Sequence, residues 1–448
     1  MSTFSGMSNL PFIILSHRGN RSLRLVKLHK EHPILRTGPN ALSFGRVAAI
    51  KDIYGHGTPC TKDEQYIVGA GSHYHLADVV DKAEHARKRK VLSSAYALKN
   101  LERWEFKVAD KVQRMIAQID KLCTEPPAKH ERFPRPEDVR VDLRAWFNFF
   151  SLDAIRKDGT TFETNLRDCL YPTARKQSRL IWSYDYYKIL DRISDVLPYY
   201  RRMSKAAEGW EAIVLYQAAR RLERYRRGEK LDDFFQALME DKNGKPQNLD
   251  VTTAIALTNV LYQLLLHPDV LAKLRREIDD ALEPEEVVAP YDKVKHLPYL
   301  RACLDESLRL WPPTPHGLPR KTPPEGLCIM GEYVPGNTTV SMSALVAHRD
   351  ETVFPDADKF IPERFLGDKG KELQSAFITF SAGARGCIGR NISYLEQAVV
   401  LASVVHRYDF ALPAGFELQR EETMNHILGP MPVKAWRRDL RAKARESG

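Results

Sequence analysis

Apolar residues recur along this chain at the spacing of long amphipathic helices. From Trp104 to Cys123 they fall every three or four residues, and the segment from Trp210 to Tyr225 is a second example. The first segment has its apolar face at Val112, Met115, Ile116, Ile119 and Leu122. Further on, the run from Ile388 to Phe410 has apolar residues at the same spacing. These patterns predict a chain that is mostly helical.

Strand patterns are fewer and shorter. Ile34-Leu35-Arg36-Thr37 is typical of a strand, and the segment from Cys328 to Val340 predicts a hairpin that turns at Pro335-Gly336-Asn337. No internal repeat, low-complexity tract or interdomain linker is found in the sequence. We therefore expect a single domain that is mainly α-helical with a small β region.

Composition and charge exclude some classes of function. The chain has 448 residues, of which 43% are hydrophobic, and its net charge is +10. The positive charge is spread out, and its short clusters at residues 87–90 and 220–227 are typical of solvated helix faces, so we expect no binding to nucleic acid. The apolar run Leu10-Pro11-Phe12-Ile13-Ile14-Leu15 is too short to span a bilayer. We expect a soluble or peripherally bound protein.

One cysteine stands in a setting that suits metal chemistry. Cys387 follows a glycine-rich turn and precedes the helix predicted from Ile388, so it lies at a helix N-terminus, where the dipole and the free N–H groups favour a thiolate over a thiol. Gly383, Gly386 and Gly389 allow tight turns and the close approach of a flat ligand. A thiolate is a strong, soft ligand for iron.

The spacing Phe-x-x-Gly-x-Arg-x-Cys-x-Gly, which runs from Phe380 to Gly389, resembles the haem-binding loop of the cytochrome P450 family. The resemblance implies that Cys387 is the axial thiolate ligand of the haem iron, and that Phe380, Arg385 and Gly389 also belong to the haem site. A buried structural cysteine is the alternative, which five fixed positions in ten residues disfavour.

Two further motifs carry the same resemblance. Glu306-Ser307-Leu308-Arg309 lies in a segment that Pro298 opens and Pro312-Pro313 stop, which predicts a helix, and Phe360-Ile361-Pro362-Glu363-Arg364-Phe365 follows later. In the family, the helix glutamate and arginine join the arginine of the second motif in a buried triad. The resemblance implies that Glu306, Arg309 and Arg364 form this structural triad.

The family also suggests which cations hold the haem propionates. His85 and Arg89 stand four residues apart on a predicted helix, so they share a face and can reach one anionic edge. Arg320 and Arg385 match two further propionate contacts of the family. A solvated basic helix is the alternative for His85 and Arg89.

The match is weaker where the family activates oxygen. The family pattern there is Ala/Gly-Gly-x-Asp/Glu-Thr-Thr/Ser, in which the acid and the threonine relay protons. Thr252 and Thr253 align with the threonine positions, which makes them the candidate catalytic residues, but Val251 stands in place of the acid and Asp250 is one place early. Segments after Ile155 and before Thr252 are shorter than the resemblance leads us to expect.

The resemblance implies a single cytochrome P450 domain over residues 10–440, similar to fungal microsomal members that are benzoate 4-monooxygenase-like and serve secondary metabolism. It implies a haem-thiolate monooxygenase that inserts one atom of O2 into a small-to-medium apolar or aromatic substrate. Electrons would come from NADPH through NADPH–cytochrome P450 reductase. We expect a monomer at the cytoplasmic face of the endoplasmic reticulum, with Leu318 and the segment from Asn425 to Leu428 as pocket walls.

Two alternatives follow from the altered oxygen-activating segment. One is isomerase or dehydratase chemistry on the same haem-thiolate fold, which needs no external electrons. The other is a haem-binding protein with impaired turnover, because Val251 cannot relay a proton. Product formation that depends on NADPH and reductase would separate a monooxygenase from both.

Overall fold

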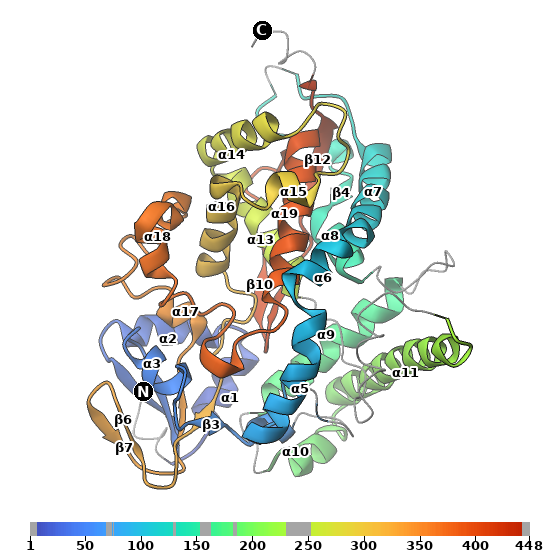
Figure 1. Ribbon diagram of the computed structural model, residues 1–448. Helices are drawn as coiled ribbons and strands as arrows, with labels where there is room; N and C mark the ends of the chain where they lie inside the picture. Colours follow the sequence, from blue (N-terminus) through green and yellow to red (C-terminus); the bar gives the residue numbers. More distant parts are fainter. Residues whose placement is uncertain are drawn as a thin grey trace.

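Helices dominate the part of the chain that this computed structural model describes, which is residues 7–68, 74, 76–128, 131–152, 163–181, 186–229 and 252–440. Figure 1 shows α1 to α3 and the hairpin β6–β7 at one end of the molecule and α14 at the other. The α-helices are α1 (Leu10–His17), α2 (Arg21–His29), α3 (Ala49–Tyr54), α4 (Gln65–Val68), α5 (Lys82–Ala95), α6 (Leu98–Arg103), α7 (Glu105–Leu122), α8 (Leu143–Leu152), α9 (Glu163–Leu180), α10 (Tyr187–Ser194), α11 (Pro198–Arg226), α13 (Thr252–Leu266), α14 (Pro268–Ala281), α15 (Tyr291–Val294), α16 (Pro298–Leu310), α17 (Ala344–Ala347), α18 (Gly367–Leu373) and α19 (Arg390–Arg407).

The strands of the described residues form several small sheets. The largest has the order β1-β2-β8-β5-β3, and the others are β4-β12-β9 and the pairs β10-β11 and β6-β7. Their bounds are β1 (Ile34–Gly38), β2 (Ala41–Phe44), β3 (Thr61–Lys62), β4 (Val141–Asp142), β5 (Arg320–Lys321), β6 (Leu327–Ile329), β7 (Glu332–Val334), β8 (Thr339–Ser341), β9 (Tyr408–Ala411), β10 (Arg420–Glu422), β11 (His426–Leu428) and β12 (Pro432–Arg437). The prediction of a mainly helical protein with a small β region is confirmed.

Two helices run through the core and position the site. Residues 253–264 of α13 are all buried, and α19 is buried from Tyr394 to His406 apart from Glu396. The two helices pack against each other, and both also pack against α16. Helices that are apolar on every side are typical of a protein core. The core therefore holds together the three helices that surround the Cys387 loop.

Most of the predicted elements are present. The segment from Trp104 to Cys123 forms α7, the segment from Trp210 to Tyr225 lies within α11, and Ile34 begins β1. The helix predicted from Ile388 to Phe410 is shorter at both ends, because α19 begins at Arg390 and the chain continues from Arg407 directly into β9. Apolar spacing did not separate the end of the helix from the strand that follows it, since both are buried.

The predicted hairpin around Pro335-Gly336-Asn337 is wrong. β7 pairs instead with β6 across Met330-Gly331, and β8 leaves to pair with β2 and β5. Met330 and Gly331 have φ of 55° and 82°, the positive values that a tight two-residue hairpin turn requires. The backbone at residues 335–338 bonds instead with Thr322, which directs β8 into the larger sheet.

The segments after Ile155 and before Thr252 that we expected to be short fall at residues 153–162 and 230–251, outside the described residues.

Among the helices that are described, none is by itself long and apolar enough to cross a membrane, and α13 with α14, which pass that test together, meet at a bend of 113°.

Arg309 on α16 is fully buried and uses every donor that a guanidinium group has. Its Nε and Nη2 donate to the Glu306 carboxylate at 2.7 and 2.9 Å. Its Nη1 donates to the carbonyl oxygens of His348 and Ala357 at 2.8 and 2.7 Å, and Nη2 also donates to that of Lys359 at 3.0 Å. One side chain thus ties α16 to three points of the segment that precedes the Cys387 loop.

Arg364 completes this buried network. Its Nε donates to Glu306 at 3.1 Å, and its terminal nitrogens donate to the backbone carbonyls of Pro355 and Asp356. The Ile361 N–H donates to the same Glu306 oxygen at 2.8 Å. The structure therefore brings together the three residues that the resemblance grouped, Glu306, Arg309 and Arg364, and surrounds them with backbone partners.

We predict that Arg309→Ala lowers the free energy of unfolding by about 3–5 kcal/mol, because it leaves the Glu306 carboxylate buried without its partner. This is a large part of the roughly 5–15 kcal/mol that holds most domains folded. Denaturant unfolding measures the change. Arg276→Ala, which removes an exposed arginine from α14, is the matched control and should unfold like the wild type. An Arg309→Ala variant as stable as the control would contradict the role given to this network.

Candidate functional site

The loop that carries Cys387 is a tight structure built on backbone constraints. Ser381 and Gly383 have φ of 58° and 63°, and the Cys387 N–H donates to the Phe380 carbonyl at 2.8 Å. A Cβ on Gly383 would lie 2.1 Å from the Tyr54 carbonyl oxygen, so only glycine fits there. Gly389 is the N-cap residue of α19, two positions beyond the cysteine. The loop thus holds Cys387 just outside the helix N-terminus.

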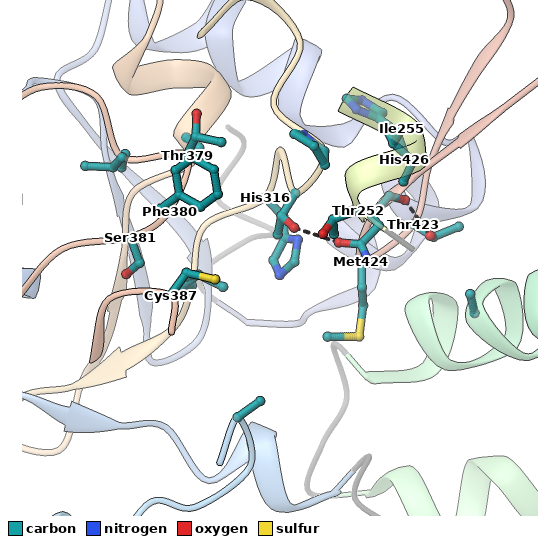
Figure 2. Close-up of a pocket in the computed structure, with 18 of the residues that line it drawn as sticks. Thr252, Ile255, His316, Thr379, Phe380, Ser381, Cys387, Thr423, Met424 and His426 are labelled. Carbon is teal, nitrogen blue, oxygen red and sulfur yellow. Dashed lines mark hydrogen bonds between the residues drawn. The ribbon is translucent and has the colours of Figure 1, made fainter. Parts of the chain in front are cut away.

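Cys387 faces a cavity of about 610 Å³. Figure 2 shows Phe380, Ser381 and Cys387 along one side of this cavity and Thr252, Ile255 and Met424 along another. The walls are largely apolar, with Ile255, Ala256, Leu308, Leu318, Met342, Ile378 and Ile427 among the lining residues. Of the predicted walls, Leu318, Asn425, His426 and Ile427 line the cavity. The other, Leu428, is buried and is not among these lining residues.

Two histidines that the sequence analysis did not assign a role also line the cavity. His316 and His426 are buried, and burial lowers the pKa of each to about 3, so both rings are neutral. The His316 ring hydrogen-bonds to the Met424 backbone, and His426 Nδ1 lies 3.1 Å from the Pro312 carbonyl oxygen. These two histidines therefore give the cavity uncharged hydrogen-bonding groups.

Cationic side chains gather beside the cavity at the Cys387 loop. Arg385 lines the cavity and donates to the Val79 and Val80 carbonyls, and Arg320 is buried and donates to the Tyr66 hydroxyl at 3.1 Å. Arg89 Nη1 donates to the Gly386 carbonyl at 2.6 Å, which places α5 against the loop.

His85 belongs to the same group. Burial, with repulsion from Arg385, Lys62, Arg89 and Arg320, lowers its pKa to about 3. The structure thus brings together His85, Arg89, Arg320 and Arg385, the four residues that the resemblance grouped, and the neighbouring cations favour a neutral His85 ring.

Lys62 is a further member of this group, and the sequence analysis missed it. It lies on β3 directly opposite Arg320 on β5, and its Nζ donates to the carbonyls of Leu76 and Ala77 at 3.0 and 2.6 Å. Burial and repulsion from Arg385 and Arg320 lower the pKa of Lys62 to about 7. Buried like charges of this kind are stabilised by an anion, so the cluster fits a ligand with negative groups.

The two candidate catalytic threonines have different surroundings. Thr252, the first described residue of α13, lines the cavity. Thr253 is buried, and its hydroxyl lies 3.3 Å from that of Ser393 on α19. Val251 and Asp250 lie outside the described residues.

The described residues contain no group of three or more histidine, cysteine or acidic side chains that could hold a metal ion. A thiolate at Cys387 would suit the iron of a porphyrin as its protein ligand, and the two propionates of that porphyrin would suit the cation cluster.

Comparison with known proteins supports this interpretation. A sequence model described as Cytochrome P450 matches residues 17–435. The chain belongs to the cytochrome P450 family. It is 30% identical to cytochrome P450 monooxygenase FCK2 of Fusarium pseudograminearum over 91% of this chain and 74% of that protein. It is also 30% identical to cytochrome P450 monooxygenase AMT3 of Alternaria alternata, over 87% of this chain and 83% of that protein.

A third relative is benzoate 4-monooxygenase bphA of Aspergillus niger, which is 27% identical over 94% of this chain and 87% of that protein. The resemblance to fungal members of the family, benzoate 4-monooxygenase-like sequences included, is confirmed. As a cytochrome P450, the chain is a haem-thiolate protein whose electrons come from NADPH through a reductase.

The described residues fit haem in two respects. The mutual repulsion among Lys62, Arg320 and Arg385 is relieved by an anionic edge, and Gly383 keeps the loop backbone close to α3 without a side chain in between. When bound, the haem supplies oxygen activation at its iron. Cys387 would hold that iron, and the cation cluster, with Lys62 added, would hold the propionates.

We predict that Lys62→Met speeds the loss of haem to an acceptor protein by about ten- to a hundredfold, because a charged hydrogen bond contributes about 1.5–3 kcal/mol and 1.4 kcal/mol is a factor of ten. Transfer of haem from the purified holoenzyme is followed by absorbance. Lys82→Met removes an exposed lysine from the start of α5 and should leave the rate unchanged. Equal rates in the two variants would remove Lys62 from the haem site.

Proposed function

We propose that this cytochrome P450 inserts one oxygen atom of O2 into a small-to-medium apolar or aromatic substrate that binds in the Cys387 cavity. The observation that carries the proposal is the arrangement of that cavity, with one cysteine, apolar walls and a cluster of cations on the same side as the Cys387 loop. The relatives support it, since they are named as fungal monooxygenases and one is named for benzoate.

In this proposal each residue has a role that its position supports. Cys387 binds iron, while Phe380 and Gly389 shape the loop around it. The propionates are bound by His85, Arg89, Arg320 and Arg385, with Lys62. Thr252 presents its hydroxyl to the cavity, where it orients and passes protons, and Thr253 lies behind it.

The substrate class follows from the cavity. Haem and substrate must share it, which leaves room for a molecule of modest size. Apolar walls favour an aliphatic or aromatic group, and neutral His316 and His426 can hydrogen-bond with one polar substituent. A charged group would find less favourable partners away from the cation cluster.

We also propose that residues 10–440 work as one domain and as a monomer, with a separate reductase as redox partner. One hydrophobic cluster draws residues from Leu101 to Ala435, and two others pack residues 12–60 against residues 329–378, which supports one domain. α5 lies against the Cys387 loop through Arg89 and carries basic residues next to it. Arg87 and Lys88 pair with Glu84, while Lys90 is exposed and is the better candidate for docking an acidic reductase.

For localisation we propose peripheral binding to the cytoplasmic face of the endoplasmic reticulum. The surface of α10 and the turn after it exposes Ile189, Ile193, Val196 and Leu197, by 57%, 60%, 81% and 54%. Around them, cations are exposed at Lys188, Arg192, Arg201 and Arg202. An apolar strip flanked by basic residues is typical of segments that lie in a membrane interface with anionic lipids.

We predict that the purified protein with a fungal NADPH–cytochrome P450 reductase forms hydroxylated product from benzoate-sized aromatic substrates, and that product requires NADPH, O2 and reductase together. Mass spectrometry with 18O2 measures the incorporated atom. Product without NADPH would favour isomerase or dehydratase chemistry, and a haem spectrum without any product would favour the impaired protein.

We predict that Lys90→Glu slows reduction by the reductase at low salt more than Lys30→Glu does, a change at the exposed residue that follows α2. The difference should shrink as salt is added, since exposed charges are screened beyond a Debye length of about 8 Å at physiological salt.

We predict that Val196→Asp and Ile193→Asp weaken binding to vesicles of phosphatidylcholine and phosphatidylserine, because each places a charge in the apolar strip of α10. Vesicle co-sedimentation measures the bound fraction. Phe106→Asp on α7, where the side chain is 60% exposed, is the matched control and should bind like the wild type. If all of these proteins bound vesicles equally, or none did, the membrane surface proposed for α10 would be wrong.

A further inference from the structure

The turn between β10 and β11 forms a wall of the cavity that lies across from the Cys387 loop. Figure 2 shows Thr423 and Met424 of this turn on one side and Phe380, Ser381 and Cys387 on the other. A ligand group that the turn holds would leave the rest of the ligand directed toward Cys387. The turn is therefore a place where the orientation of a substrate can be decided.

One anchor of the turn is a buried ion pair at the N-terminus of α2. Arg21 Nη2 donates to the Glu422 carboxylate at 3.1 Å, and both side chains are buried. The Ser22 N–H and hydroxyl donate to the same carboxylate at 2.6 and 2.7 Å. The helix dipole also favours a carboxylate at this end of a helix. Glu422 thus holds the start of the turn against α2.

The other anchor is the segment that follows α16. The His426 N–H donates to the Pro313 carbonyl at 2.8 Å, and His426 Nδ1 lies 3.1 Å from the Pro312 carbonyl oxygen. Within the turn, the N–H and the hydroxyl of Thr423 both donate to the Asn425 carbonyl, at 2.9 and 2.6 Å. The backbone on both sides of Asn425 is therefore fixed by hydrogen bonds.

The Asn425 carboxamide is oriented by Thr314. Thr314 Oγ1 donates to Asn425 Oδ1 at 2.6 Å, and both residues line the cavity. Since Oδ1 serves as the acceptor of this bond, Nδ2 and its two N–H donors are directed elsewhere. No residue in the described part of the chain accepts from Nδ2, and Nδ2 is not among the fully buried polar atoms that lack a partner. An amide donor of fixed direction is therefore open to a ligand in the cavity.

The cavity wall around this donor is uncharged. The lining residues from segments 313–319 and 423–427 are Pro313, Thr314, His316, Leu318, Pro319, Thr423, Met424, Asn425, His426 and Ile427. Both histidines are neutral, because burial lowers the pKa of each to about 3. Of the described residues that line the cavity, the charged ones are Asp78 and Arg385, which lie at the Cys387 loop, where Arg385 donates to the carbonyl of the residue after Asp78. A carboxylate at the turn would lose its water without a cation in the wall beside it, whereas a neutral carbonyl oxygen needs only a donor.

We propose that Asn425 is a specificity-determining residue that donates a hydrogen bond from Nδ2 to a neutral carbonyl oxygen of the substrate. The inference rests on the proposed oxygenation and narrows its substrates to apolar or aromatic molecules that carry a ketone, ester or amide group. Thr314 is a positioning residue, because it fixes which end of the carboxamide faces the ligand. The substrate carbon nearest Cys387 is then one that is far from the carbonyl group.

The first test measures binding to the oxidised holoenzyme by the change in haem absorbance and needs no turnover. Acetophenone and ethylbenzene are matched probes, since they differ only in the carbonyl group. Asn425→Leu keeps the size of the side chain and removes its donors. It should weaken acetophenone binding by about tenfold, the size expected for one hydrogen bond, and leave ethylbenzene binding unchanged.

The control for this test is Asn40→Leu, which changes an exposed asparagine between β1 and β2. It should bind both probes like the wild type. Haem content and circular dichroism show whether each variant is folded. If folded Asn425→Leu kept the wild-type ratio of the two affinities, the role given to Asn425 would be wrong.

Two further arms test the orientation of the amide and the charge of the ligand. Thr314→Val should also weaken acetophenone binding, because the carboxamide is then free to turn Oδ1 toward the ligand, while Thr314→Ser keeps the hydroxyl and should bind like the wild type. Benzoate should bind the wild type more weakly than acetophenone at neutral pH. Equal losses in Thr314→Val and Thr314→Ser would contradict the positioning role, and tighter binding of benzoate would contradict the choice of a neutral carbonyl.

The second test reads the position of the inserted oxygen. With NADPH and reductase, the wild type should hydroxylate acetophenone mainly at the ring carbon opposite the carbonyl group, because the turn holds the carbonyl and this carbon then lies toward Cys387. Asn425→Leu should spread the product over several positions, which chromatography against standards measures. An unchanged distribution of products in this variant would overturn the orienting role of Asn425.

The two tests separate the subsite from the function on which it rests. If the wild type forms no product from any probe, the proposed oxygenation fails, and the binding titration alone then decides whether Asn425 holds the carbonyl group. If the wild type forms product and Asn425→Leu changes neither the affinity ratio nor the product positions, the oxygenation stands and the subsite is wrong.

Discussion

The guanidinium group of Arg309 is the interaction on which the rest of the site depends. It is buried in the core, where an unpaired charge would be costly, and it is fully paired with Glu306 and with backbone carbonyls of the segment from His348 to Lys359. His348 extends this link. Its Nδ1 donates a hydrogen bond to the Arg309 backbone carbonyl, and its Nε2 accepts one from the Ile378 N–H, each at 3.0 Å. Burial lowers the pKa of His348 to about 3, so the neutral ring can donate on one side and accept on the other.

The consequence of this link reaches the Cys387 loop. Ile378 and Thr379 are the residues just before the loop, and Thr379 Oγ1 donates to the Leu308 carbonyl on α16 at 3.1 Å. The position of the loop is thus fixed from α16 in two ways, through Thr379 and through His348, whose backbone carbonyl accepts from the Arg309 guanidinium group. Beyond the loop, α19 packs against α13, which fixes Thr252 and Ser393 relative to Cys387. Packed helices therefore fix the shape of the cavity, while its chemistry depends on a few side chains such as Cys387 and Thr252.

The parts of this site that could be predicted from the sequence are those in which a short motif carries its own constraint. The Cys387 loop and the pair Glu306 and Arg309 are of this kind, because glycine positions and helical spacing are local properties. Lys62 could not be predicted, since its place in the cation cluster depends on the pairing of β3 with β5, which are only two residues each. His316 was missed because its role depends on how its loop folds over the cavity.

The errors in the predicted elements have the same origin. The turn of β6–β7 is at Met330-Gly331, a pair without the asparagine or aspartate that usually marks such a turn, so the more conspicuous Pro335-Gly336-Asn337 was chosen. The end of α19 could not be read from apolar spacing, because the strand that follows it is buried on the same side of the core. Both the position of the hairpin turn and the end of α19 depend on the pairing of strands, which a local sequence pattern does not show.

The central claim is that Cys387 binds haem iron as a thiolate, and the absorption spectrum of the reduced protein with carbon monoxide tests it most directly. We predict a red-shifted Soret band in the wild type and in Cys328→Ala, which removes an exposed cysteine of β6, and no such band in Cys387→Ala. Circular dichroism shows whether each variant is folded. A red-shifted band that persists in folded Cys387→Ala, or its absence from a haem-loaded wild type, would contradict the claim.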